Sequence, residues 1–189
     1  MGRLRIIAGS LRGRRFSVPR GLRVRPTPER AREGLFSILG ERVPGARLLD
    51  AYGGSGALGL EALSRGAGEV VFVEVDRRVA EVLRENVAAL SLERRCRVFV
   101  ADAVDALRDR LVRGPFELIL ADPPYRTPQA ERFAAAAAAP GWLTPGGLLV
   151  IERQTGEPPL ERAGGRLERR RTARYGDTRF DFYPADPRT

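Results

Sequence analysis

The segment Asp122-Pro123-Pro124-Tyr125 combines a carboxylate, two rigid residues and an aromatic ring. Proline fixes the backbone and has no N–H group, so the carbonyl groups of such a segment remain available as acceptors. The exocyclic amine of a nucleic-acid base is a poor nucleophile, because its lone pair is delocalised into the ring. A carboxylate and a carbonyl that accept its hydrogens can hold the nitrogen in a more tetrahedral form, and an aromatic side chain can stack on the base. We therefore interpret these four residues as candidate catalytic residues for chemistry on such an amine.

A glycine-rich segment at residues 50–59 forms the second candidate site. It follows a predicted strand and opens a predicted helix, and its glycines permit a tight turn that a ligand can approach closely. Glu74 follows Gly54 by about twenty residues, at the end of the next predicted strand, where a carboxylate can accept the hydroxyls of a ribose. The residues that we predict to hold a nucleoside cofactor here are Asp50, Gly53, Gly54, Ser55, Gly56, Glu74, Val75, Asp102 and Ala103.

Asp50 favours S-adenosyl-L-methionine over a dinucleotide as this cofactor. A carboxylate at the strand end can organise the glycine turn and attract the ammonium group of the methionine, whereas it would repel a pyrophosphate. Asp102 follows the third predicted strand and can accept a hydrogen bond from the adenine amino group. It can equally cap a helix that begins at Ala103, and the two roles do not exclude each other.

The hydrophobic pattern from residue 46 onward alternates between strands and helices. Predicted strands include residues 48–49, 70–73, 98–100, 116–121 and 147–151. Such alternation predicts an α/β protein with a parallel sheet and helices on both faces. Ligands of open α/β sheets bind beyond the carboxyl ends of the strands, so both candidate sites should lie at one edge. Residues 166–174 and 178–183 flank a turn at 175–177, which predicts a C-terminal antiparallel hairpin.

The first 44 residues are predicted to form a separate extension. Short strands at residues 4–7 and 14–18 are separated by glycines and should pair. Thr27 is the predicted N-cap of a following helix, with Pro28 at its first position. We therefore divide the chain into an N-terminal extension, residues 1–44, that would bind RNA, and a catalytic domain, residues 45–189.

The net charge of +9 and the isoelectric point near 11.1 suggest a polyanionic partner. All basic residues are arginine and none is lysine, which also fits genome bias or heat adaptation. The distribution favours a nucleic acid, because the first 25 residues hold eight arginines and no acid. The arginines of this segment that we predict to contact RNA are Arg3, Arg5, Arg12, Arg14, Arg15 and Arg25.

Several classes of protein are excluded by composition. The chain has no histidine and a single cysteine, Cys96, so it can form neither a Ser-His-Asp triad nor an internal disulfide, and a metal cluster is not expected. It contains no apolar run of the ~20 residues that would span a bilayer. Its N-terminal segment lacks the apolar region of a signal peptide, so we expect a cytoplasmic protein without membrane contact.

Taken together, these motifs resemble a known group, the bacterial 16S ribosomal RNA (guanine-N2)-methyltransferases of the small subunit. The resemblance covers nearly the whole chain. The segments that carry it are residues 5–9, 12–14, 25–27, 30, 32–33, 35–36, 54–67, 73–74, 122–125 and 175–178. Residues 50–53 depart from the group, because they read Asp-Ala-Tyr-Gly where its members usually carry Asp-Leu-Phe-Ala.

The resemblance implies a Rossmann-like methyltransferase fold with a seven-stranded, mostly parallel sheet that ends in an antiparallel hairpin. It implies S-adenosyl-L-methionine as cofactor and guanine N2 of 16S ribosomal RNA as methyl acceptor, within the small ribosomal subunit or its assembly intermediate. It also implies a monomer. Thr27 is thereby added to the predicted cofactor residues, and Arg30 and Arg32 to the predicted RNA contacts.

Three other functions remain open at this stage. An amino-methyltransferase could act on adenine or cytosine of DNA or of another RNA, although few residues outside the predicted core are left for a target-recognition domain. A nicotinamide-dependent oxidoreductase would share the glycine turn, but Asp50 and Asp122 speak against it. A non-catalytic RNA-binding module would not need Asp122, Glu74 and the glycine turn together.

Overall fold

Seven strands form one sheet in the order β10-β11-β7-β6-β3-β4-β5. The computed structural model describes residues 2–19 and 27–188. Five consecutive strands of this order pair in parallel, and they are β7 (Leu143–Gln154), β6 (Phe116–Ala121), β3 (Arg47–Asp50), β4 (Glu69–Glu74) and β5 (Cys96–Val100). At one end, β11 (Thr178–Pro184) pairs antiparallel with β7, and β10 (Arg171–Tyr175) pairs antiparallel with β11. The predicted fold class and the predicted C-terminal hairpin are confirmed.

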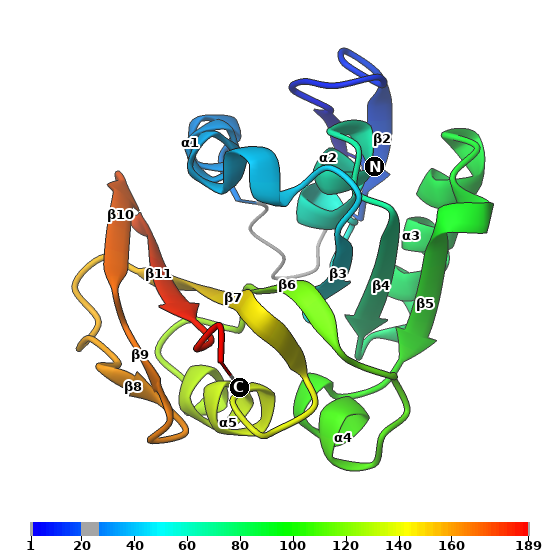
Figure 1. Cartoon of the computed structure of the whole chain (residues 1–189). Coiled ribbons are helices and arrows are strands. Elements are labelled where there is room, and N and C mark those ends of the chain that lie inside the picture. The colour runs from blue at the N-terminus through cyan, green and yellow to red at the C-terminus, as the bar shows by residue number, and fades with distance from the viewer. Residues whose placement is uncertain (1, 20–26, 189) are drawn as a thin grey trace.

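Helices cover both faces of the sheet (Figure 1). One face carries α1 (Glu29–Leu39), α2 (Ala57–Ser64) and α3 (Arg77–Ala89), and the other carries α4 (Ala103–Arg108) and α5 (Gln129–Ala137). Successive strand residues alternate between the two cores: Leu48 packs on the α1–α3 side and Leu49 on the α4–α5 side. Strands buried on both faces explain the continuous apolar runs in the sequence.

Shorter elements complete the chain. Two single turns of 3₁₀-helix lie at η1 (Gly40–Arg42) and η2 (Glu93–Arg95), and β8 (Arg162–Ala163) pairs with β9 (Leu167–Glu168). Within residues 2–19 and 27–188, no helix combines the length and the apolar character that crossing a membrane requires.

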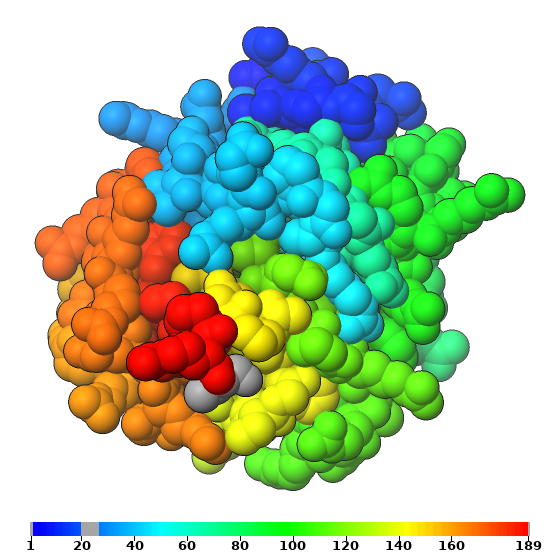
Figure 2. Space-filling model, viewed as in Figure 1, coloured from blue at the N-terminus to red at the C-terminus, as the bar shows by residue number. Residues whose placement is uncertain are grey.

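The N-terminal extension begins with a hairpin of β1 (Gly2–Arg5) and β2 (Arg15–Val18), and its first strand starts two residues earlier than predicted. Figure 2 shows this hairpin at one end of the molecule, beside α1. The hairpin is packed against α2, because the Glu61 carboxylate accepts hydrogen bonds from the backbone N–H groups of Ile7 (2.8 Å) and Ala8 (3.1 Å). Because α2 also packs on β3 and β4, every one of its residues from Leu58 to Ser64 is buried.

Two further side chains join the extension to the glycine turn. The buried Asn86 amide of α3 donates to the carbonyls of Ser17 (2.9 Å) and Ser55 (3.0 Å), and its oxygen accepts from the Ser17 N–H (2.8 Å). Arg32 of α1 is fully buried and donates to the carbonyls of Arg5 (3.0 Å) and Ala57 (3.4 Å). The prediction that Arg32 contacts RNA is therefore corrected, since its guanidinium lies inside the protein.

The start of α1 also differs from the prediction. Pro28, and not Thr27, occupies the N-cap position, and no side chain caps the helix. Thr27 is buried instead, and its hydroxyl donates to the Glu152 carboxylate at 2.7 Å. A hydroxyl that finds a buried carboxylate forms a charge-assisted bond, which is stronger than the neutral bond it would make at a helix end.

Candidate active site

The glycine turn connects β3 to α2 and is held by its own backbone. Gly56 adopts a left-handed conformation (φ +91°) and donates to the Gly53 carbonyl at 2.7 Å. Gly54 is also left-handed (φ +53°), a region that side-chain-bearing residues rarely enter. Two residues into the helix, a Cβ atom at Gly59 would lie 2.2 Å from the Phe72 ring of β4. Glycine is thus required both for the turn and for close packing of helix and sheet.

Asp50 lies buried beneath this turn. Its carboxylate accepts a hydrogen bond from the Gly59 N–H at 2.9 Å, which fixes the first turn of α2 over the end of β3. Burial raises the pKa of Asp50 to about 7, the nearby Glu74 charge adds to the increase, and the Gly59 hydrogen bond opposes it. A cation near this carboxylate would favour its ionised form.

Glu74 ends β4 beside the same turn. Its two oxygens accept from the backbone N–H groups of Gly54 and Asp76, each at 2.8 Å. A carboxylate offers about four lone-pair positions, so both oxygens retain capacity for further donors such as ribose hydroxyls. The next residue, Val75, is 67% exposed and presents an apolar surface alongside.

Asp102 follows β5 and caps α4. One of its oxygens accepts from the N–H groups of Val104 (2.8 Å) and Asp105 (3.1 Å), as the capping interpretation predicts. Ala103 is buried at the first position of the helix. The predicted adenine contact of Asp102 stays a prediction.

Asp122 follows β6, which is the strand next to β3 in the sheet. Pro123 is buried, whereas Pro124 is exposed and its carbonyl accepts from the Thr127 hydroxyl at 2.7 Å. Residues 2–19 and 27–188 provide no hydrogen bond to the Asp122 carboxylate. Burial, together with the charges of Glu152 and Asp50, raises the pKa of Asp122 well above its ordinary value.

Glu152 is a site residue that the sequence interpretation missed. It lies in β7, is 2% exposed, and accepts hydrogen bonds from the hydroxyls of Tyr125 (2.6 Å) and Thr27 (2.7 Å). The same rule that singled out Asp122 could have found it, because Glu152 directly follows the predicted strand 147–151. Thr27, predicted as a cofactor residue, lies at this second carboxylate.

The carboxyl edge of the sheet therefore carries one acid at each parallel strand. In sheet order these residues are Glu152, Asp122, Asp50, Glu74 and Asp102. The glycine turn and Glu74 occupy one part of the row, and the Asp122 segment occupies the neighbouring part. Such an edge can hold a nucleoside at the turn and present a proton acceptor and an aromatic ring directly beside it.

The predicted RNA contacts are distributed over the extension. Arg3, Arg12 and Arg15 are exposed on the hairpin, and Arg30 is exposed on α1. Arg5 and Arg14 are exposed as well, but Arg5 pairs with Glu29 (2.7 Å) and Arg14 donates to the Ala89 carbonyl (3.0 Å). Arg25 lies outside the described residues.

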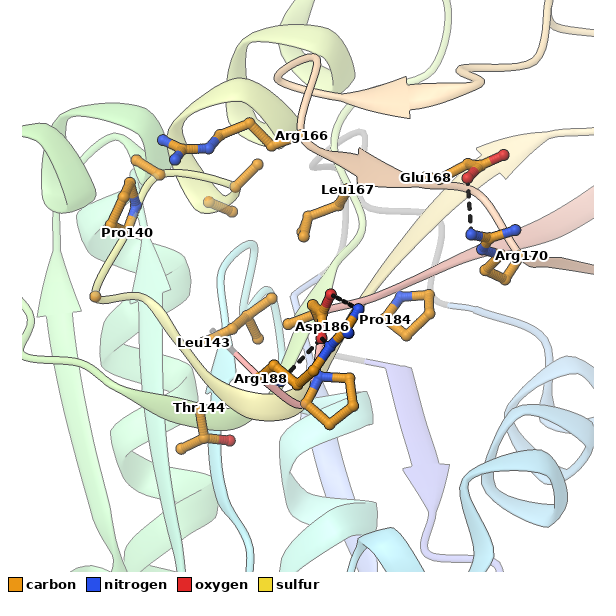
Figure 3. A pocket seen from close by; sticks show the side chains of 16 residues that line it. Pro140, Leu143, Thr144, Arg166, Leu167, Glu168, Arg170, Pro184, Asp186 and Arg188 are labelled. Carbon is orange, nitrogen blue, oxygen red and sulfur yellow. Dashed lines mark hydrogen bonds and ion pairs between the residues drawn. The ribbon is translucent and has the colours of Figure 1, made fainter.

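A cavity of about 820 Å³ lies elsewhere, where β7 begins and β11 ends. Figure 3 shows Arg166, Glu168, Arg170, Asp186 and Arg188 around it, with ion pairs from Glu168 to Arg170 and from Asp186 to Arg188. It faces the edge opposite the glycine turn, because β7 starts there and ends at the turn's edge. None of the predicted site residues lines this cavity.

Comparison with known proteins agrees with this geometry. A family model described as "Conserved hypothetical protein 95" matches residues 4–184. The ribosomal RNA small subunit methyltransferase D of Escherichia coli strain K12 is 38% identical over 81% of this chain and 76% of its own length. This chain belongs to that family of ribosomal RNA methyltransferases.

Solved structures support the same membership. The Escherichia coli protein yhhF is 35% identical and superposes with a TM-score of 0.86, covering 98% of this chain and 99% of that one. The 16S rRNA N2 G1207 methyltransferase of Thermus thermophilus, solved with AdoMet and guanosine, is 26% identical with a TM-score of 0.73. It covers 97% of this chain and 50% of that larger chain.

The raised pKa of Asp50 gives a pH-dependent stability. The folded protein keeps the Asp50 proton up to about pH 7, whereas the unfolded chain releases it near about pH 4. Ionisation of Asp50 therefore costs the folded state stability as the pH rises through this interval. The Asp50→Asn variant cannot ionise at this position, so its free energy of unfolding does not fall for this reason. The difference in free energy of unfolding, Asp50→Asn minus wild type, should therefore increase from pH 4 to pH 7.

Urea unfolding at several pH values measures this difference. Asp109→Asn, which replaces an exposed carboxylate, serves as the charge-matched control. A difference between Asp50→Asn and wild type that stays constant with pH would show that the pKa of Asp50 is the same in the folded and in the unfolded chain.

Proposed function

We propose that this protein transfers a methyl group from S-adenosyl-L-methionine to the exocyclic N2 amine of a guanine in 16S ribosomal RNA. The observation that carries the proposal is the adjacency of two sites at the carboxyl edge of the sheet. The glycine turn ends β3, the Asp122-Pro123-Pro124-Tyr125 segment ends the neighbouring strand β6, and the charge of Asp50 acts on Asp122.

The residues of the turn fit the cofactor. Glu74 has acceptor capacity for the ribose hydroxyls, Val75 offers an apolar surface for the adenine ring, and buried Asp50 suits a neighbouring ammonium group. When bound, S-adenosyl-L-methionine supplies an electrophilic methyl group on a sulfonium sulfur. The glycine turn and Glu74 would hold the nucleoside end of the cofactor at the end of β3, which is the strand next to β6.

The residues of the second segment fit an amine of a base. The Asp122 carboxylate accepts one amine hydrogen and the Pro123 carbonyl the other, which directs the nitrogen lone pair away from both acceptors. Asp122 then accepts the proton that the nitrogen loses after it gains the methyl group. The ring of Tyr125 offers a stacking surface for a base that has left its helix.

Guanine as the target is supported by the Thermus thermophilus relative, whose name states N2 methylation of 16S rRNA and whose structure holds guanosine. The exposed arginines of the extension, residues 1–44, supply contacts for RNA phosphates. A cavity of about 430 Å³ between the hairpin and α1 is lined by Arg5, Arg12 and Arg65 together with Glu29 and Glu33. We propose that residues 45–189 carry the catalytic site and that the protein acts as a monomer.

Glu74→Ala tests the cofactor site. Charge-assisted hydrogen bonds contribute roughly 1.5–3 kcal/mol, so affinity for S-adenosyl-L-methionine should fall at least about tenfold. Isothermal titration calorimetry measures the affinity. Glu69→Ala is the matched control, because Glu69 begins β4 whereas Glu74 ends it, so the two carboxylates lie at opposite ends of the same strand. Equal affinity in both variants would remove Glu74 from the site.

Asp122→Ala tests the chemistry. Removing the proton acceptor should lower the single-turnover rate by about 10²–10⁴-fold, while cofactor affinity stays close to that of the wild type. The assay transfers a tritiated methyl group to small ribosomal subunits and identifies the modified nucleoside by mass spectrometry. A variant rate within tenfold of wild type would contradict the role of Asp122. A product other than N2-methylguanosine would contradict the proposed acceptor.

Substitution of Arg3, Arg12 and Arg15 by glutamine tests the RNA surface. The affinity for ribosomal RNA should fall and depend less steeply on salt, because fewer counterions are released from the RNA when fewer phosphates are contacted. The slope of the logarithm of the affinity against the logarithm of the salt concentration should change by about 0.7–0.9 for each lost contact. The control triple variant replaces Arg113, Arg162 and Arg166, which are exposed and lie outside the N-terminal extension. If both triple variants flatten the slope equally, the hairpin has no specific part in RNA binding.

A further inference from the structure

Glu152 and Asp122 occupy equivalent places on neighbouring parallel strands. The last paired residues of β6 and β7 are Ala121 and Ile151, and each acid lies one position further along. Ala121 and Ile151 pack toward α4 and α5, so the alternation of the strands turns both acids to the face that α1 covers. In agreement with this, Glu152 meets Thr27 immediately before α1.

Glu152 connects three segments of the site through short hydrogen bonds. The Tyr125 hydroxyl donates to one carboxylate oxygen at 2.6 Å, and the Thr27 hydroxyl donates to the other at 2.7 Å. Both distances fall in the range of charge-assisted O–H···O⁻ bonds, which are stronger than neutral ones. A side chain that is 2% exposed holds these partners in a dry environment, where such bonds strongly restrict their orientation.

The contact with Tyr125 bears on the substrate. A tyrosine ring can rotate about two side-chain torsions, and a base stacks on it only when the ring plane is correctly set. The hydrogen bond to Glu152 fixes the hydroxyl end of the Tyr125 ring and leaves the face of the ring available for a base. Small misplacements of reacting groups lower rates by up to about 10²-fold, so this restriction matters for turnover.

The charge of Glu152 bears on Asp122. Within residues 2–19 and 27–188, the ionisable groups that act on Asp122 are Glu152 from β7, Asp50 from β3 and Tyr125 from its own segment. Like charges close together disfavour ionisation, so Glu152 strengthens the affinity of Asp122 for a proton. The group that must accept a proton from the methylated amine is thereby made a stronger base.

We propose that Glu152 is a positioning residue of the methyl-transfer reaction, which orients the Tyr125 ring through a hydrogen bond and presents its carboxylate beside Asp122 on the neighbouring strand. This inference rests on the proposed function and assigns a role to a residue that does not itself touch the base. Its two effects are separable, because the first requires the hydrogen bond to Tyr125 and the second requires the charge.

Three variants separate the effects. Glu152→Gln removes the charge and keeps the size, Tyr125→Phe removes the hydrogen bond and keeps the charge, and Glu152→Asp keeps the charge on a shorter side chain. Glu131→Gln is the control, because it removes a partly exposed carboxylate on α5. Circular dichroism and cofactor titration confirm that each variant is folded.

The first readout needs no substrate. The side-chain carboxyl carbon of Asp122 is titrated by carbon-13 NMR, with Asp122→Asn used for its assignment. Glu152→Gln should move the Asp122 titration to lower pH, since the neighbouring negative charge is gone. The Asp122 titration should stay closer to that of the wild type in the three variants that keep a negative charge at position 152, which are Glu152→Asp, Tyr125→Phe and Glu131→Gln. An unmoved titration in Glu152→Gln overturns the proposal, even if the wild type proves to methylate another base.

The second readout is the single-turnover rate on small ribosomal subunits as a function of pH. The rate falls at low pH as Asp122 is protonated, and Glu152→Gln should shift this fall to lower pH. The plateau rate should drop by about ten- to a hundredfold in Tyr125→Phe, which loses the hydrogen bond, and by less in Glu152→Gln, whose amide oxygen can still accept from the Tyr125 hydroxyl. A plateau rate in Tyr125→Phe equal to that of the wild type would overturn the positioning of Tyr125. Failure of the wild type to methylate guanine would overturn the proposed function, and the NMR titration would still decide the inference.

Discussion

Parallel pairing of five strands is the constraint on which the rest of this structure depends. It brings the carboxyl ends of β7, β6, β3, β4 and β5 to one edge, and each of these ends carries an acid. Such a row of like charges is unfavourable unless the charges are compensated, and backbone N–H groups compensate three of them. Gly59 donates to Asp50, Gly54 and Asp76 donate to Glu74, and the first turn of α4 donates to Asp102.

The remaining two acids, Glu152 and Asp122, differ from each other in their hydrogen-bond donors. Glu152 receives hydroxyl donors from two distant segments, whereas Asp122 receives no hydrogen bond from residues 2–19 and 27–188. Among the described residues, one of these carboxylates is therefore held by two hydroxyl donors and the other is held by none. This asymmetry between neighbouring strands fits the proposed roles, in which Asp122 accepts a proton and Glu152 positions Tyr125.

Much of this arrangement follows from the sequence, and the exceptions have physical reasons. The strands, the glycine turn and Asp122 are predicted because local patterns specify them. The partner of Thr27 lies 125 positions away, so no local pattern could reveal that its hydroxyl binds a carboxylate and not the start of α1. Arg32 is a different case: it is followed by Leu35, Phe36 and Leu39 at helical spacing, so its burial could have been predicted from the same face.

The Asn86 amide gives this architecture a thermodynamic consequence. One side chain bonds both Ser17 of the hairpin and Ser55 of the glycine turn, so displacement of either segment breaks bonds that orient the other. Two binding equilibria that are coupled through such a bridge obey linkage. If a ligand on the hairpin changes the affinity of the turn for its ligand by some factor, a ligand at the turn changes the affinity of the hairpin by the same factor. The extension and the glycine turn are thus joined through one buried side chain, and any coupling between ligands on the two surfaces would act equally in both directions.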